Sequence, residues 1–213
     1  MSTTMSTQAL PKTGEAATSK SGGSRLLKPV VFIACLIPAV WEFYAVFIAQ
    51  KYVDPIDALE KSTGEWGLRL LILTLCITPL QMIFKWGAVA KLRRMLGLFV
   101  FFYATLHLLV WVVLDQRVDI KAAAYAIVDK PFITVGIIVW LYLLALAVTS
   151  NKFSVRKLGI KWKKLHNWIY FFTVLSVVHY IWQVRADDIL EPAIYMGIIA
   201  VLLGWRFTRI MSR

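Results

Sequence analysis

The amino-acid sequence predicts an all-α, polytopic membrane protein built as a bundle of six transmembrane helices. Of its 213 residues, 59% are hydrophobic and only 17% are charged, whereas a soluble domain carries about 25–35% Lys, Arg, Glu and Asp on its surface. Six apolar runs are long enough to span a bilayer, and the loops between them alternate between basic and acidic composition. These features exclude a soluble protein or one with a large extramembrane domain.

The six apolar runs define the predicted helices, because each is near the ~17–25 residues that a helix needs to cross the hydrocarbon. The runs occupy approximately residues 29–50, 67–85, 95–115, 132–150, 166–184 and 190–207. Residues 1–28 are rich in Ser, Thr, Gly and Lys, so we expect a disordered tail. The predicted organisation is this tail, a six-helix domain at 29–207 and a short C-terminal tail at 208–213.

The charges of the loops predict the orientation in the membrane. Seventeen basic residues lie in the N-terminal tail, in loops 85–94 and 151–165 and at the C-terminus, whereas the other loops together hold ten carboxylates and six basic residues. The positive-inside rule therefore places both termini, and both tails, in the cytoplasm. The net charge of +12 is a topology signal and does not indicate nucleic-acid binding. Loop 151–165 either acts only as a determinant of membrane topology or also binds a phospholipid, a quinone headgroup or an FMN phosphate.

Several kinds of chemistry have no support in the sequence. Cys35 and Cys76 both lie in apolar runs, so they indicate no disulfide framework and are too few for a Cys-ligated iron–sulfur cluster, which needs about four thiolates. No internal repeat is evident, and no GxGxxG, P-loop, HExxH or CxxC pattern occurs. The sequence thus shows no nucleotide-binding or flavin domain. If the chain transfers electrons, its donor and acceptor must therefore be separate molecules.

Two of the three histidines are predicted at equal depth in the membrane. His107 lies thirteen residues after Arg94, where the third helix starts, and His179 lies thirteen residues after His166, where the fifth starts. At about 1.5 Å per residue, both lie about 20 Å from the cytoplasmic face on parallel helices. This geometry is typical of a bis-histidine haem, with one axial imidazole from each helix. The alternative is that each histidine is an interhelical hydrogen-bonding group.

His166 and Arg93 form a second pair at the cytoplasmic boundary. His166 is a candidate ligand of a second haem, or else an interfacial histidine. A guanidinium stays protonated, so Arg93 suits a haem propionate or a flavin phosphate better than iron. Thirteen residues leave His166 and His179 about 140° apart on an ideal helix. Sharing a face would therefore require a local distortion, or else His166 belongs to a fraying first turn.

Four other polar residues have weaker claims to function. Glu42 in the first helix suggests proton or quinone chemistry, or else an interfacial placement. Tyr103, Thr105 and Tyr180 lie beside the histidines in sequence. We expect these three to be packing and interhelical hydrogen-bonding groups rather than redox relays.

Three segments carry a resemblance to a known family. They are RRMLGLFVFFYATLHLLVW at 93–111, KLGIKWKKLHNWIYFFTVLSVVHYIW at 157–182 and ITPL at 77–80. The sequence resembles the MsrQ (YedZ) family, a branch of the ferric reductase-like transmembrane superfamily, over residues 30–207. In that superfamily two helices each carry two histidines and hold two stacked haems. This chain departs from the pattern at Arg93, where the fourth histidine would stand, and the MsrQ family shares the departure.

The resemblance implies a six-helix haem-binding domain of the ferric reductase-like type in a bacterial inner membrane. It implies one haem b, or two, and an FMN is also attributed to the family. Electrons would pass from the quinone pool to MsrP, a periplasmic molybdopterin enzyme that reduces methionine sulfoxide in oxidised proteins. The chain would then be a redox subunit that lacks the sulfoxide-reducing site.

Two other functions stay open on the sequence. A ferric-chelate reductase of the same architecture would differ only in its final electron acceptor. A non-redox transporter or scaffold would use the histidines as packing groups, and it would bind no haem.

The predicted orientation is testable with a reporter enzyme that is active only outside the cytoplasm. A fusion within loop 151–165 should be inactive and a fusion within loop 115–131 should be active, because the basic loop stays on the cytoplasmic side. Reporter activity from loop 151–165 would reverse the orientation.

Overall fold

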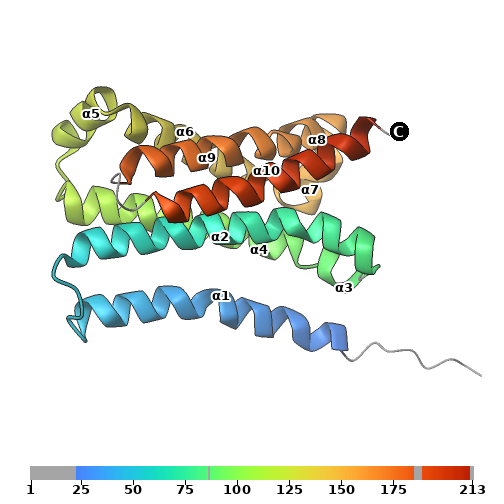
Figure 1. The fold of residues 1–213 in the computed structure, drawn as a ribbon, viewed down its shortest axis with the longest axis horizontal. Helices are drawn as coiled ribbons and strands as arrows, with labels where there is room; N and C mark the ends of the chain where they lie inside the picture. The colour runs from blue at the N-terminus through green and yellow to red at the C-terminus, as the bar shows by residue number, and fades with distance from the viewer. Residues whose placement is uncertain (1–22, 86, 185–188, 212–213) are drawn as a thin grey trace, which may run out of the picture.

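The computed structural model describes residues 23–85, 87–184 and 189–211, and it confirms the all-α class (Figure 1). Its long helices are α1 (Gly23–Phe47), α2 (Pro55–Phe84), α4 (Arg93–Leu109), α6 (Pro131–Thr149), α9 (Ile169–Gln183) and α10 (Leu190–Met211). Helix α4 continues into a π-helical segment, η1 (Val110–Asp115). The shorter helices are α3 (Gly87–Ala90), α5 (Ile120–Asp129), α7 (Lys152–Leu158) and α8 (Ile160–Asn167).

The long helices lie side by side, so that the connections gather at two opposite ends of the bundle (Figure 1). Helices α3, α7 and α8 and the C-terminal end of α10 lie at one end, which we name the basic end after loops 85–94 and 151–165. Helix α5 and the connection between α1 and α2 lie at the other end, which we name the acidic end. This arrangement agrees with the alternation of loop charge in the sequence.

The protein is a multi-pass membrane protein, and five helices in its described part are long and apolar enough to cross a bilayer. The fifth predicted span, at 166–184, is not among these five helices, because it is divided between α8 and the 15-residue α9. Trp168 separates them with a helical backbone (φ −65°, ψ −9°). The interruption lies between His166 and His179, so the two histidines belong to different helices.

Helix α2 begins twelve residues earlier than the apolar pattern predicted, at Pro55 rather than near residue 67. The side chain of Asp54 caps it by accepting a hydrogen bond from the Asp57 N–H (3.1 Å), and Pro55 occupies the first turn, where its fixed φ suits a helix. Glu60 and Glu65, which were expected in a loop, therefore lie on this helix.

The ends of the chain differ slightly from the predicted boundaries. Helix α1 begins at Gly23, so the last residues of the predicted tail are helical, and residues 1–22 lie outside the described residues. Helix α10 continues to Met211, beyond the predicted boundary at 207, and residues 212–213 also lie outside the described residues.

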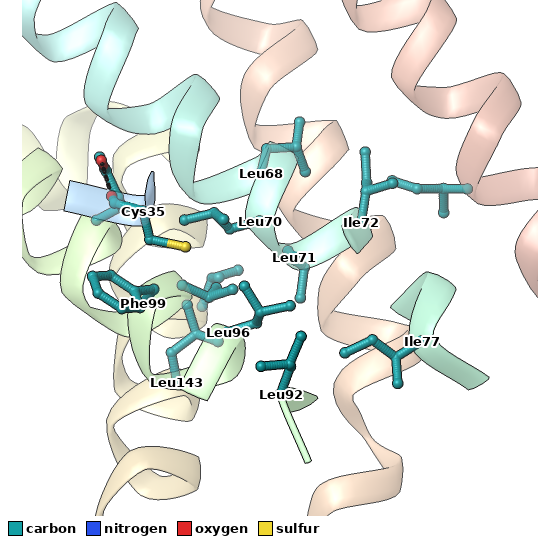
Figure 2. Packing of buried hydrophobic residues seen from close by; sticks show 14 of the residues in the cluster. Cys35, Leu68, Leu70, Leu71, Ile72, Ile77, Leu92, Leu96, Phe99 and Leu143 are labelled. Carbon is teal, nitrogen blue, oxygen red and sulfur yellow. Dashed lines mark hydrogen bonds between the residues drawn. The ribbon is translucent and has the colours of Figure 1, made fainter. Parts of the chain in front are cut away.

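The core lies where α1, α2, α4 and α6 meet, and it is built from Leu, Ile, Val and Phe side chains (Figure 2). Leu71, Leu96 and Leu143 are examples from three of these helices. Large apolar side chains such as Val40, Leu141 and Val201 are instead exposed on the outer surface. An apolar exterior around a packed interior is what a bilayer requires.

Tyr103 joins α1 to α4 through a break in the α1 hydrogen-bond ladder. Its hydroxyl donates to the Cys35 carbonyl (2.7 Å) and accepts from the Ala39 N–H (3.1 Å). These two groups would bond each other in a regular helix, so the hydroxyl is inserted between them, next to Pro38. The Tyr103 side chain is fully buried. It thus satisfies two backbone groups and ties the first helix to the bundle.

We predict that Tyr103→Phe lowers the free energy of unfolding by about 1 kcal/mol, because the two α1 backbone groups lose their shared partner. Denaturant titration in mixed micelles measures the change. Tyr125→Phe is the matched control, since Tyr125 is exposed on α5. Equal stability of the two variants would show that α1 recloses its own hydrogen bond without cost.

Candidate functional site

A cavity of about 460 Å³ lies between α2, α4, α6 and α9, and it is lined by both His107 and His179. The centroids of the two imidazole rings are 6.1 Å apart, and the ring planes are nearly perpendicular, at 85°. The structure therefore brings together the two histidines for which the sequence predicted equal depth.

Each imidazole is oriented by a hydrogen bond to a backbone carbonyl. The Nδ1 atom of His107 lies 2.9 Å from the Glu60 carbonyl oxygen on α2, and the Nδ1 of His179 lies 2.7 Å from the Phe132 carbonyl oxygen on α6. A carbonyl oxygen only accepts, so Nδ1 carries the proton in both rings and donates it. Each Nε2 therefore keeps a lone pair available for a metal ion.

A glycine makes room for each histidine ring. A Cβ atom at Gly64 would lie 3.2 Å from His107 Cε1, and a Cβ at Gly136 would lie 2.8 Å from His179 Cε1. Gly64 and Gly136 each follow the accepting carbonyl by four residues, one helical turn. Because glycine has no side chain, the histidine ring can lie close to that turn of the helix.

The two halves of the site are related by an internal repeat that was not evident in the sequence. His179, Gly136 and the carbonyl of Phe132 each lie 72 residues after their counterparts, which are His107, Gly64 and the carbonyl of Glu60. One half comes from α2 and α4, and the other comes from α6 and α9. The signal in the sequence was this constant spacing of a Gly and a His, which a search for longer similarity misses.

The geometry fits a single metal ion with two axial imidazoles. With a metal–nitrogen distance of about 2 Å and roughly 1 Å from Nε2 to the ring centroid, two opposed imidazoles have centroids about 6 Å apart. Within residues 23–85, 87–184 and 189–211, no three His, Cys, Asp or Glu side chains are placed to hold a metal ion. The remaining ligands would therefore come from a planar macrocycle, as in haem. The helix also widens to the π form directly after the His107 turn, a feature frequent at functional sites.

A charged network that the sequence analysis missed lies beside the cavity. Glu65 lines the cavity, accepts a hydrogen bond from the Tyr180 hydroxyl (3.1 Å) and pairs with Arg69 (2.8 Å). Arg69 also pairs with Glu191 (3.1 Å) and donates to the Tyr195 hydroxyl (2.7 Å). The network joins α2, α9 and α10, so it satisfies charged groups that would be costly in lipid and fixes α9 beside the cavity.

The structure places His166 and Arg93 away from the cavity. The ring of His166 stacks on Trp162 (centroids 4.0 Å apart), and its Nδ1 lies 3.1 Å from the Trp162 carbonyl oxygen. Its buried Nε2 has no hydrogen-bond partner among the residues that the structure describes. Arg93 donates to the Thr78 hydroxyl (2.9 Å). Neither residue lines the cavity that holds the other two histidines.

The remaining polar candidates have hydrogen-bonding roles. Thr105 accepts from the Trp140 indole N–H (3.1 Å), which confirms its predicted interhelical bond, as do the contacts of Tyr103 and Tyr180 described above. Glu42 accepts from the Tyr52 hydroxyl (3.2 Å) near the end of α1. This contact is at the acidic end and is compatible with an interfacial placement of Glu42.

Comparison with known proteins supports the same architecture. Residues 63–177 match the family model described as ferric reductase like transmembrane component. The chain is 43% identical over 191 residues to a protein of Xanthomonas axonopodis pv. citri, covering 87% of both chains. It is 42% identical to a protein of Azospira oryzae (84% of this chain, 78% of the relative) and 38% identical to one of Brucella anthropi (93% and 92%). Each relative is named protein-methionine-sulfoxide reductase heme-binding subunit MsrQ.

We predict that Gly136→Ala lowers the free energy of unfolding by about 1–3 kcal/mol, because the new Cβ overlaps the His179 ring and displaces it from the Phe132 carbonyl. Gly197→Ala on α10 is the matched control. A Cβ there meets no atom within 4 Å, so the better helix propensity of Ala should stabilise the protein by about 0.5–1 kcal/mol. Denaturant titration compares the two variants, and shifts of the same sign would contradict the assigned role of Gly136.

Proposed function

Because the chain belongs to the ferric reductase-like transmembrane family, within its MsrQ branch, we propose that it is the haem-binding electron-transfer subunit of a methionine sulfoxide reductase system. The proposal places one haem b between His107 and His179. A bound haem supplies one-electron chemistry at its iron. The observation that carries the proposal is the pair of imidazoles whose centroids lie 6.1 Å apart, each with Nδ1 held by a carbonyl and the Nε2 lone pair left for a metal ion.

The residues of the cavity favour electron transfer over reactions at an open iron position. A haem held by both His107 and His179 would have no free position for a small molecule such as oxygen. The Glu60 and Phe132 carbonyls fix the orientation of the two rings, which would keep reorganisation small during electron transfer. Glu65, a carboxylate of the cavity lining, is already paired with Arg69, which also pairs with Glu191.

The position of the site in the bundle supports a direction of transfer. His107 lies near the end of α4 and His179 near the end of α9, and both helices run toward the acidic end. In the orientation predicted by loop charge, that end faces the periplasm of a bacterial inner membrane, with both termini in the cytoplasm. We therefore propose the quinone pool as electron donor and a periplasmic MsrP-type molybdoenzyme as acceptor. The name of the relatives, a subunit of a protein-methionine-sulfoxide reductase, supports a separate catalytic partner.

A second cofactor at the basic end is a weaker part of the proposal. The unpartnered Nε2 of His166 supports a ligand there, either a second haem or an FMN close to Arg93. The packing around it is tight, however, because Tyr142 stacks on Phe172 (3.8 Å between centroids) and donates to the Leu165 carbonyl (2.8 Å). We therefore assign one haem to the chain and use His166 as the internal comparison in the experiment.

We predict that His107→Ala or His179→Ala removes nearly all of the low-spin haem spectrum, because the loss of one axial imidazole leaves the iron five-coordinate. Haem content by the pyridine haemochrome assay and the rate of quinol-driven reduction are measured on these two variants and on His166→Ala. Added imidazole should restore the low-spin spectrum of the two cavity variants, since it replaces only the missing ligand.

His166→Ala separates the two interpretations of the basic end. If His166 is interfacial, haem content and reduction rate stay unchanged; if it holds a cofactor, one of them falls while the low-spin signal persists. A wild-type protein without haem after expression with ample haem supply would favour the transporter or scaffold. Full low-spin haem in His107→Ala would refute the ligand assignment.

A further inference from the structure

The cavity is polar at one end and apolar at the other. Near the acidic end its lining includes two lysines, Lys61 and Lys130, and the amide of Gln183, together with the carboxylates of Asp57, Glu60 and Asp115. These residues come from the first turns of α2, from the end of η1, from the connection before α6 and from the end of α9.

The opposite end of the cavity has no charged residue in its lining. Leu68 and Leu71 follow Lys61 by two to three turns of α2, and Leu143 lies at the same depth on α6. Figure 2 shows these three side chains within the packed core. The polarity of the cavity therefore runs along the axis of the bundle, with water-compatible groups toward the acidic end.

Haem b has a polarity of the same kind, since one edge carries two propionates and the other edges carry methyl and vinyl groups. A carboxylate placed among Leu68, Leu71 and Leu143 would lose its hydration without gaining a hydrogen-bond donor, so this end of the cavity disfavours it. We propose that haem lies in this cavity with its propionate edge at the acidic end, where Lys61 and Lys130 are its cationic partners. This inference rests on the proposed function and deepens it, because it assigns the propionate subsite.

The carboxylates that share this end predict which substitutions should weaken and which should strengthen the binding of a propionate. Gln183 Nε2 donates to Glu60 Oε1 (3.5 Å), so part of the amide's donor capacity is already used. Asp57, Glu60 and Asp115 line the same end as the two lysines, so a propionate would enter a region with three carboxylates and two positive charges. Removal of a lysine should weaken the binding of the propionate form, whereas removal of the Asp115 charge should strengthen it.

The experiment compares two ligands on the full-length apo-protein in detergent micelles. Haem b and haem b dimethyl ester, which lacks the carboxylate charges, are titrated and followed by the Soret band, and the ratio of their dissociation constants is recorded. In the double variant Lys61→Met/Lys130→Met the preference for haem b over the ester should fall roughly tenfold relative to wild type. This fall corresponds to the combined free energies of two partly exposed ion pairs. Asp115→Asn should raise the same preference by roughly threefold.

Lys121→Met is the matched control, because Lys121 is exposed on α5 and does not line the cavity. Binding of the ester shows that each variant is folded. If the double lysine variant does not bind the ester, the two single lysine variants are measured in its place. An unchanged preference in the lysine variants, or a fall in Asp115→Asn, would overturn the propionate assignment while leaving the haem site intact. A wild-type protein that binds neither ligand would instead overturn the proposed function.

Discussion

Two hydrogen bonds from imidazole to backbone carbonyl organise the centre of this protein. They run from His107 to the carbonyl of Glu60 and from His179 to that of Phe132. Because a carbonyl inside a helix moves only with the helix, the packing of α2 on α4 and of α6 on α9 sets the orientation of each ring. The same bonds select the tautomer with the proton on Nδ1, which leaves the lone pair on Nε2.

The constant offset of 72 residues shows that the same arrangement of residues occurs twice at the centre of the protein. A histidine on one helix, a glycine on its neighbour and a carbonyl one turn before the glycine recur in each half. In the proposed haem site, each half would contribute one imidazole. Neither half would be complete alone, so a bound haem would also join the two halves of the bundle.

The bilayer explains why polar groups elsewhere occur in satisfied sets. Arg69 is shared by Glu65 and Glu191, and Tyr103 bridges two backbone groups of α1. In hydrocarbon an unpaired polar group costs several kcal/mol, so such groups are stable there when they are paired. The bonds of Tyr103 and Arg69 connect α1 to α4 and α2 to α10, and so join the outer helices to the helices of the cavity.

The sequence by itself determined the all-α membrane class and the equal depth of His107 and His179. Apolar length and residue spacing are local quantities, and a helix of constant rise converts them into depth. Only the tertiary structure decided the roles of Gly64 and Gly136 and of the carbonyls that accept from the histidines. Every residue has a backbone carbonyl, and a glycine has no side chain that would indicate a role. The roles of these glycines and carbonyls are therefore defined only by the histidine on the neighbouring helix.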